Sequence, residues 1–147
     1  MFWGLIDRLD WAHKGDDQRI IEPVVGALAT RTEDEIRAFQ EALAQKLFLL
    51  DGRAWARESG PLTWWGDPDS VSSDDFLYSR CVVVANGREY FDSVLRDPTR
   101  MPKDLEFEVL ITLAMRALER KTGRTLEYNL DTKTSFETFA NKAAWPQ

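Results

Sequence analysis

Residues 70–80 read SVSSDDFLYSR and combine hydroxyl, carboxylate and guanidinium side chains within three turns of a possible helix. The adjacent carboxylates of Asp74 and Asp75, together with the guanidinium of Arg80, could bind a cation or orient a polar ligand. Ser73 completes this candidate polar cluster. One hypothesis is therefore a small-ligand or enzymatic cleft built on these four residues.

The same pattern is also typical of the first turn of a helix. The first backbone N–H groups of a helix lack partners within it, and the hydroxyl of Ser72 or Ser73 can accept a hydrogen bond from one of them. Carboxylates in that turn interact favourably with the helix dipole. Adjacent helical residues also diverge by about 100°, so Asp74 and Asp75 rarely converge on one atom. The pattern favours a structural role, with Arg80 paired to a carboxylate of this or another helix.

Nucleophilic and metal-dependent chemistry have little support in the sequence. His13 is the single histidine and Cys81 the single cysteine, which excludes a zinc site with several His or Cys ligands. Cys81 lies between Arg80 and three valines, where a small buried hydrophobic residue is expected. No phosphate-binding glycine loop or nucleophile-elbow motif occurs. We predict no catalytic residue, no metal site and no cofactor.

Two of the six tryptophans, Trp64 and Trp65, are adjacent in a segment rich in Gly, Pro, Asp and Ser. Neighbouring side chains in such a loop do not easily both turn inward. Aromatic residues are enriched where proteins bind one another. Trp64 and Trp65 are thus candidate partner contacts, with simple packing over the loop as the alternative.

The bulk composition restricts the class of protein. The 147 residues, 44% hydrophobic and 30% charged, suit one globular domain. A net charge of -6 disfavours binding to nucleic-acid phosphates and suits a basic partner protein. No apolar run is long enough to span a membrane, and the N-terminus lacks the basic start of a secretory signal. One cysteine cannot form an internal disulfide, so we expect a cytoplasmic location.

The elements that must position these residues are helical by pattern. Apolar residues at helical spacing predict a helix over residues 2–12, and a second helix begins after Asp16. Thr32 and Glu35 form a capping-box pattern at the head of a third helix, EIRAFQEALAQKLFLL. These helices precede the candidate polar cluster in the chain.

Residues 76–91, FLYSRCVVVANGREYF, are ambiguous. Three consecutive valines and the Asn86-Gly87 step favour a strand followed by a tight turn. The polar start before Phe76 favours a helix instead, with Asn86 and Gly87 as its stop. Further along, Asp104 is predicted to open another helix, which Gly123 ends.

Several segments resemble the bacterial domain-of-unknown-function family numbered 4240. They are FWGLID, LLDGRAW, SSDDFLYSR and NGREYFDSVLRDP with the helix that follows, and they cover roughly residues 2–118. The chain departs from the family pattern at Ser79 and Cys81, where the family usually has an aromatic residue and a tryptophan, and the Trp64-Trp65 loop looks like an insertion. The resemblance implies a predominantly α-helical fold and favours a helix over residues 76–85. It implies no activity.

Together these observations predict an all-α fold, with one compact multi-helix domain over residues 1–147. A Gly/Pro-rich loop is expected near residues 59–71, and an irregular tail at the C-terminus. The leading functional hypothesis is a non-enzymatic, cytoplasmic protein-interaction domain, for example an immunity- or antitoxin-like adaptor for a basic partner. The alternative is the ligand or enzyme cleft at Asp74, Asp75 and Arg80. The sequence leaves the oligomeric state open.

Overall fold

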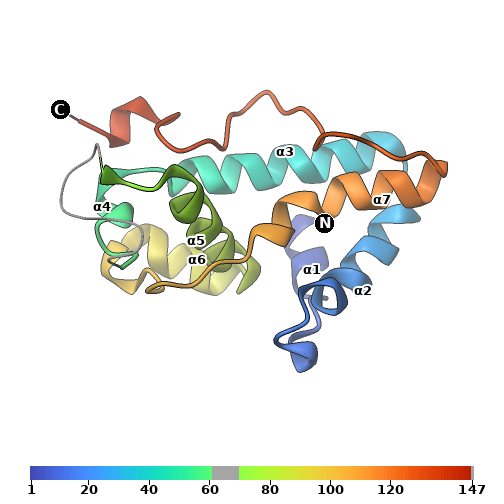
Figure 1. Cartoon of the computed structure of the whole chain (residues 1–147), viewed down its shortest axis with the longest axis horizontal. Helices are drawn as coiled ribbons and strands as arrows, with labels where there is room; N and C mark the ends of the chain where they lie inside the picture. The colour runs from blue at the N-terminus through green and yellow to red at the C-terminus, as the bar shows by residue number, and fades with distance from the viewer. Residues whose placement is uncertain (61–69, 147) are drawn as a thin grey trace.

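A computed structural model describes residues 1–60 and 70–146, and these residues contain helices and no strand (Figure 1). The predicted all-α fold is therefore confirmed. The α-helices are α1 (Phe2–Ile6), α2 (Asp17–Ala29), α3 (Glu33–Leu49), α4 (Arg53–Ala56), α5 (Ser73–Ala85), α6 (Arg88–Arg96) and α7 (Leu113–Thr122). Short 3-10 helices are η1 (Trp11–His13), η3 (Pro98–Arg100), η4 (Glu108–Thr112) and η5 (Lys142–Ala144).

The long helix α3 organises the core. It packs against α5 and α7, and α2 packs along α7. Buried apolar side chains from every labelled α-helix belong to one hydrophobic cluster, in which Ile36, Phe39 and Leu47 of α3 have no exposed surface. Because burial of apolar area is the main favourable term in folding, α3 is the element on which the others assemble.

Local capping begins the first long helices where the sequence predicts. The Asp16 side chain accepts a hydrogen bond from the backbone N–H of Arg19 at 3.3 Å and caps α2. At α3, the Thr32 hydroxyl accepts from the Glu35 backbone at 3.1 Å, and the Glu35 carboxylate accepts from the Thr32 backbone at 3.3 Å. This reciprocal pair confirms the predicted capping box.

The ambiguous segment is a helix. Ser72 is the N-cap of α5, and its hydroxyl accepts from the backbone N–H of Asp75 at 3.3 Å. The three valines that favoured a strand are all buried, because α5 is apolar on nearly every side and lies inside the helical bundle. Asn86 ends α5 and Gly87, with a φ of 98°, turns the chain into α6.

Two predicted helix limits are wrong. The helix expected over residues 2–12 ends at Ile6, and the chain then turns so that the backbone N–H of Asp10 reaches the carbonyl of Ile20 at 2.9 Å. The helix expected to open at Asp104 begins only with η4, because Asp104 has a φ of 53°. In both places, contacts with distant residues replace the local helical hydrogen bonds.

Residues 124–146, which we call the strap, follow α7 and confirm the predicted irregular tail. In Figure 1 the strap runs over α3 toward the end of the molecule that holds α4. The predicted loop near residues 59–71 lies mostly outside the described residues. Over the described parts of the chain, no helix combines the length and apolarity needed to cross a membrane.

Candidate functional site

The predicted polar cluster is split between the surface and the interior. Ser73 and Asp74 are exposed in the first turn of α5, and Asp75 is half-buried beside them. Arg80, in the same helix, has no exposed surface. The structure thus brings the two aspartates together at the helix start, as capping requires, and sends the arginine into the core.

The buried guanidinium of Arg80 joins α5 to two other parts of the chain. Its Nη1 donates to the carbonyls of Leu47 in α3, at 2.8 Å, and of Phe136 in the strap, at 3.1 Å. Its Nη2 donates to the hydroxyl of Thr138 at 2.9 Å, and the guanidinium lies 4.8 Å from the centre of the Phe76 ring. Burial lowers the pKa of Arg80 to about 10, and the nearby charge of Asp51 opposes that shift.

Asp51, which the sequence analysis did not single out, is the counterpart of Arg80. Its carboxylate has no exposed surface and accepts three hydrogen bonds from the strap: the backbone N–H groups of Phe139 and Asn141, at 3.1 and 2.9 Å, and Nε1 of Trp145, at 2.8 Å. The available signal was an aspartate directly after the apolar run LFLL, in a segment that resembled the family. On sequence alone, Asp51 and Gly52 indicate either the end of the preceding helix or a short helical turn that holds Trp55, and neither alternative implies a buried carboxylate.

A second polar feature lies where α5 meets the segment before η4. The carboxyl of Glu106 forms a hydrogen bond with Asp75, and Glu108 forms one with the hydroxyl of Tyr78. Desolvation, this hydrogen bond and the charges of Asp75 and Glu108 raise the pKa of Glu106 to about 7. Desolvation and the charges of Asp74 and Glu108 likewise raise the pKa of Tyr78. Asp75 and Glu106 are therefore neighbouring carboxyl groups, which we call the carboxyl pair.

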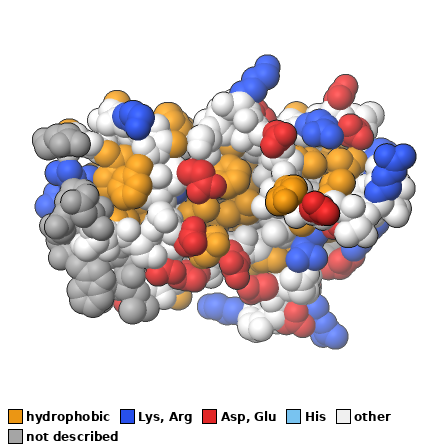
Figure 2. Space-filling model, turned by 45° about the horizontal axis from the view of Figure 1, so that its top comes forward, with side chains coloured by type: hydrophobic (Ala, Val, Ile, Leu, Met, Phe, Trp, Pro, Cys, Tyr) orange, Lys and Arg blue, Asp and Glu red, His pale blue; other side chains and the backbone are white. Residues whose placement is uncertain are grey.

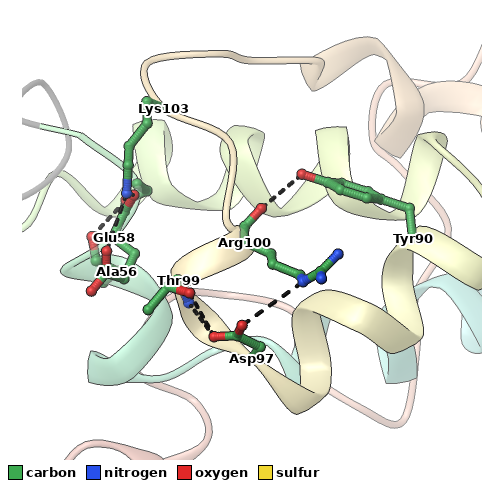
Figure 3. A network of polar contacts seen from close by, with 8 residues as sticks. Ala56, Glu58, Tyr90, Asp97, Thr99, Arg100 and Lys103 are labelled. Carbon is green, nitrogen blue, oxygen red and sulfur yellow. Dashed lines mark hydrogen bonds and ion pairs between the residues drawn. The ribbon is translucent and has the colours of Figure 1, made fainter.

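The segment that carries Glu106 is held in place by a network upstream of it (Figure 3). The hydroxyl of Tyr90 donates to the carbonyl of Arg100 at 2.8 Å, while Asp97 caps η3 through Thr99. Lys103 forms an ion pair with Glu58 at 3.1 Å and also donates to its carbonyl. These contacts fix the path of the chain between α6 and η4.

Next to the carboxyl pair is a groove of about 440 Å³, which we call the Trp11 groove. Trp11 is 39% exposed and lies against Phe107, with ring centres 5.4 Å apart. Leu105, 55% exposed, stands at its edge. The groove is lined by Trp11, Lys14, Gly15, Asp17, Ile20, Val82, Asn86, Leu105, Glu106 and Phe107. Figure 2 shows acidic side chains beside hydrophobic ones on one face of the molecule.

The remaining candidates are not brought into a site. Nδ1 of His13 is hydrogen-bonded to the carboxylate of Asp10 at 2.8 Å on the surface, and Cys81 is fully buried in α5, where burial raises the pKa of its thiol to about 12. No group of three or more metal-binding side chains is gathered within residues 1–60 and 70–146. Trp64 and Trp65 lie outside the described residues, so their predicted partner contact stays a prediction.

Comparison with known proteins gives a family and no activity. Neither the curated proteins nor the solved structures contained a match to the chain. A family described as Protein of unknown function (DUF4240) matches residues 1–120, a region that holds both Asp51 and Arg80 and stops before the strap. The extent of this match shows that the chain belongs to the DUF4240 family.

Proposed function

We propose that the protein is a non-enzymatic, cytoplasmic interaction domain that binds a basic segment of a partner protein in the Trp11 groove. The observation that supports this best is an exposed aromatic side chain, Trp11, in the same groove as the acidic side chains of Asp17 and Glu106. An immunity- or antitoxin-like adaptor that blocks a basic enzyme is one specific form of this function.

A lysine or arginine side chain of the partner can make two kinds of contact in the groove, one with an aromatic ring and one with carboxyl groups. The ring of Trp11 can cover the apolar stem or the charged head of the side chain, and tryptophan is the best aromatic partner for a cation. The carboxylate of Asp17 can accept its hydrogen bonds, and so can Glu106 once an approaching cation favours the ionised form of its carboxyl group. The net charge of -6 would also steer a basic partner toward the molecule.

The alternative function, a small-ligand or enzyme cleft at Asp74, Asp75 and Arg80, has weaker support. Arg80 has no exposed surface, and its two terminal nitrogens donate to the carbonyls of Leu47 and Phe136 and to Thr138, so its guanidinium faces the interior and not an open cleft. The thiol of Cys81 is buried and protonated at neutral pH, which removes it as a nucleophile.

The proposal is tested by capture of partners on the immobilised protein, followed by measured affinities. We expect the parent to capture a protein with a basic segment from a lysate of its own cells, and a synthetic peptide of that segment to bind the purified protein. Trp11→Ala and Glu106→Lys should each lower the affinity for the peptide by about tenfold or more, as changes at binding hot spots do. Added salt should also lower the affinity of the parent for the peptide, since the contacts are between opposite charges.

Two exposed residues outside the groove provide matched controls. Tyr128→Ala removes an aromatic ring that is 79% exposed, and Glu127→Lys reverses a neighbouring exposed charge. Both should leave the affinity of the peptide unchanged. If the groove variants and these controls bind equally well, or if the captured segment is acidic, the proposed groove is not the interaction site.

A further inference from the structure

The strap is held by hydrogen bonds to polar side chains of the preceding, helical part of the chain, which we call the body. These bonds resemble the contacts between a receptor and a bound peptide. At the start of the strap, the carboxylate of Glu41 in α3 accepts from the backbone N–H groups of Lys133 and Thr134, at 2.6 and 3.1 Å. These bonds use the main chain of the strap, and an acidic side chain of the body receives them. Glu41 does not belong to the predicted polar cluster.

The middle of the strap lies between two buried charges. Arg80 donates to the carbonyl of Phe136 at 3.1 Å, and Asp51 accepts from the backbone N–H groups of Phe139 and Asn141. The body thus presents a donor and an acceptor to alternate peptide groups between Phe136 and Asn141. Main-chain hydrogen bonds to fixed polar groups give affinity in several modes of peptide recognition.

Three strap side chains add selectivity to this capture. The hydroxyl of Thr138 accepts from Arg80 at 2.9 Å and donates to the carbonyl of Ser73 at 2.7 Å. The amide of Asn141 donates to the carbonyl of Phe48 at 3.2 Å, and the indole of Trp145 donates to Asp51 at 2.8 Å. The body therefore contacts the side chains of a Thr-x-x-Asn-x-x-x-Trp pattern, which spans residues 138–145 of the strap.

The strap lies mostly on the outside of the hydrophobic core: Leu130 belongs to the core cluster, and Leu126, Phe136 and Trp145 pack against it partly buried. Of its described residues only Leu130 and Thr138 are buried, while Tyr128 and Phe139 remain exposed. The strap also supplies hydrogen-bond partners to Asp51 and Arg80, and a buried charge without partners is strongly unfavourable. Two segments that resemble the family, LLDGRAW and SSDDFLYSR, supply these two charges, and the family match ends before the strap begins.

We infer that Glu41, Asp51 and Arg80 form a peptide-binding groove of the family domain, and that the strap is its resident ligand. The ligand class is a segment with the Thr-x-x-Asn-x-x-x-Trp pattern that folds into a turn at Thr138 and Phe139 and a short 3-10 helix at Lys142–Ala144. None of these anchors lines the Trp11 groove, so the failure of one proposal leaves the other standing. We therefore expect the body to keep its helical fold when a separate peptide with the sequence of the strap takes the place of the strap.

The test starts from the folded full-length chain with a site for a specific protease inserted after Arg124, an exposed position just beyond α7. After cleavage, a fluorescently labelled peptide of residues 129–146 is added and its binding is followed by fluorescence anisotropy. We expect the cut strap to stay bound during gel filtration and the labelled peptide to exchange for it in a saturable manner. Circular dichroism should show unchanged helix content throughout.

Variants placed in the peptide leave the body intact and therefore separate binding from folding. Thr138→Val and Trp145→Ala should each lower the affinity of the peptide for the body by about tenfold or more, because each removes a hydrogen bond to a buried charge. Lys142→Ala, at an exposed strap position, is the matched control and should change the affinity by less than about twofold. Equal binding by all peptides, failure to exchange, or loss of helix on release of the strap would each overturn the inference.

Discussion

Replacement of Arg80 by methionine is the sharpest test of how the interior is held together. The change keeps most of the apolar stem and removes the guanidinium, so the carbonyls of Leu47 and Phe136 and the hydroxyl of Thr138 lose their donors. The variant therefore probes the polar link between α3, α5 and the strap. We expect it to fold and to be less stable.

The size of the effect follows from two opposing quantities. Hydrogen bonds to a charged group contribute about 1.5 to 3 kcal/mol each, and Arg80 makes three of them. Removal of the charge also removes the cost of keeping a guanidinium out of water, which offsets part of that sum. The net loss in the free energy of unfolding should be about 3 kcal/mol, which lowers the melting temperature by roughly 6 to 12 °C for a chain of this length.

Urea unfolding followed by circular dichroism measures this loss, and hydrogen exchange localises it. The strap amides that depend on Arg80 and Asp51, those of Phe139 and Asn141, should exchange faster in the variant, while amides in the middle of α2 should not. Arg80→Lys should be destabilised as well, because a lysine lacks the planar fork that holds several acceptors at once. Arg8→Met, at an exposed position, is the control and should cost less than about 0.5 kcal/mol. If Arg80→Met lies within about 0.5 kcal/mol of the parent, the buried arginine does not hold the three segments together.

Three further outcomes follow from named contacts. Ser72→Ala removes the cap of α5 and should lower the free energy of unfolding in urea by about 1 kcal/mol, whereas no change would mean that the cap is not needed. The pKa of Glu106 is raised to about 7 in the folded state, so its protonated form stabilises the fold below pH 4.5 and this contribution is lost as the pH rises through 7. The parent should accordingly lose stability relative to Glu106→Gln between pH 5 and pH 8, and a constant difference over that range would contradict the raised pKa of Glu106. Cys81, with no exposed surface and a pKa of about 12, should react with a thiol reagent only after unfolding, and fast reaction of the native protein would refute its burial.

The candidate sites differ in how far the sequence could predict them. The role of Asp74 and Asp75 at a helix start depends on backbone groups within the same turn, and it was predicted. The partners of Arg80 lie 33, 56 and 58 residues away, and two of the three acceptors belong to the strap. The sequence analysis expected a carboxylate partner, whereas the described acceptors are carbonyls and a hydroxyl.

Asp51 and Glu41 show why the receptor-like groove was missed. In the sequence, Asp51 follows an apolar run and resembles a helix stop, while Glu41 is one of several acidic residues on the polar side of α3. Their common property, acceptance of backbone N–H groups from the strap, exists only when residues about 90 positions apart meet. No local pattern marks such an acceptor.

The sequence by itself determined the helices whose ends are set by their own neighbours. The capping box at Thr32, the cap at Asp16 and the left-handed Gly123 each satisfy backbone groups within four residues, so their positions follow from the local order of side chains. Tertiary structure decided the rest: the early end of α1, the late start of η4 and the burial of Asp51 and Arg80. These features are set by burial and long-range hydrogen bonding, whose energies depend on which distant segments fill the space around a residue.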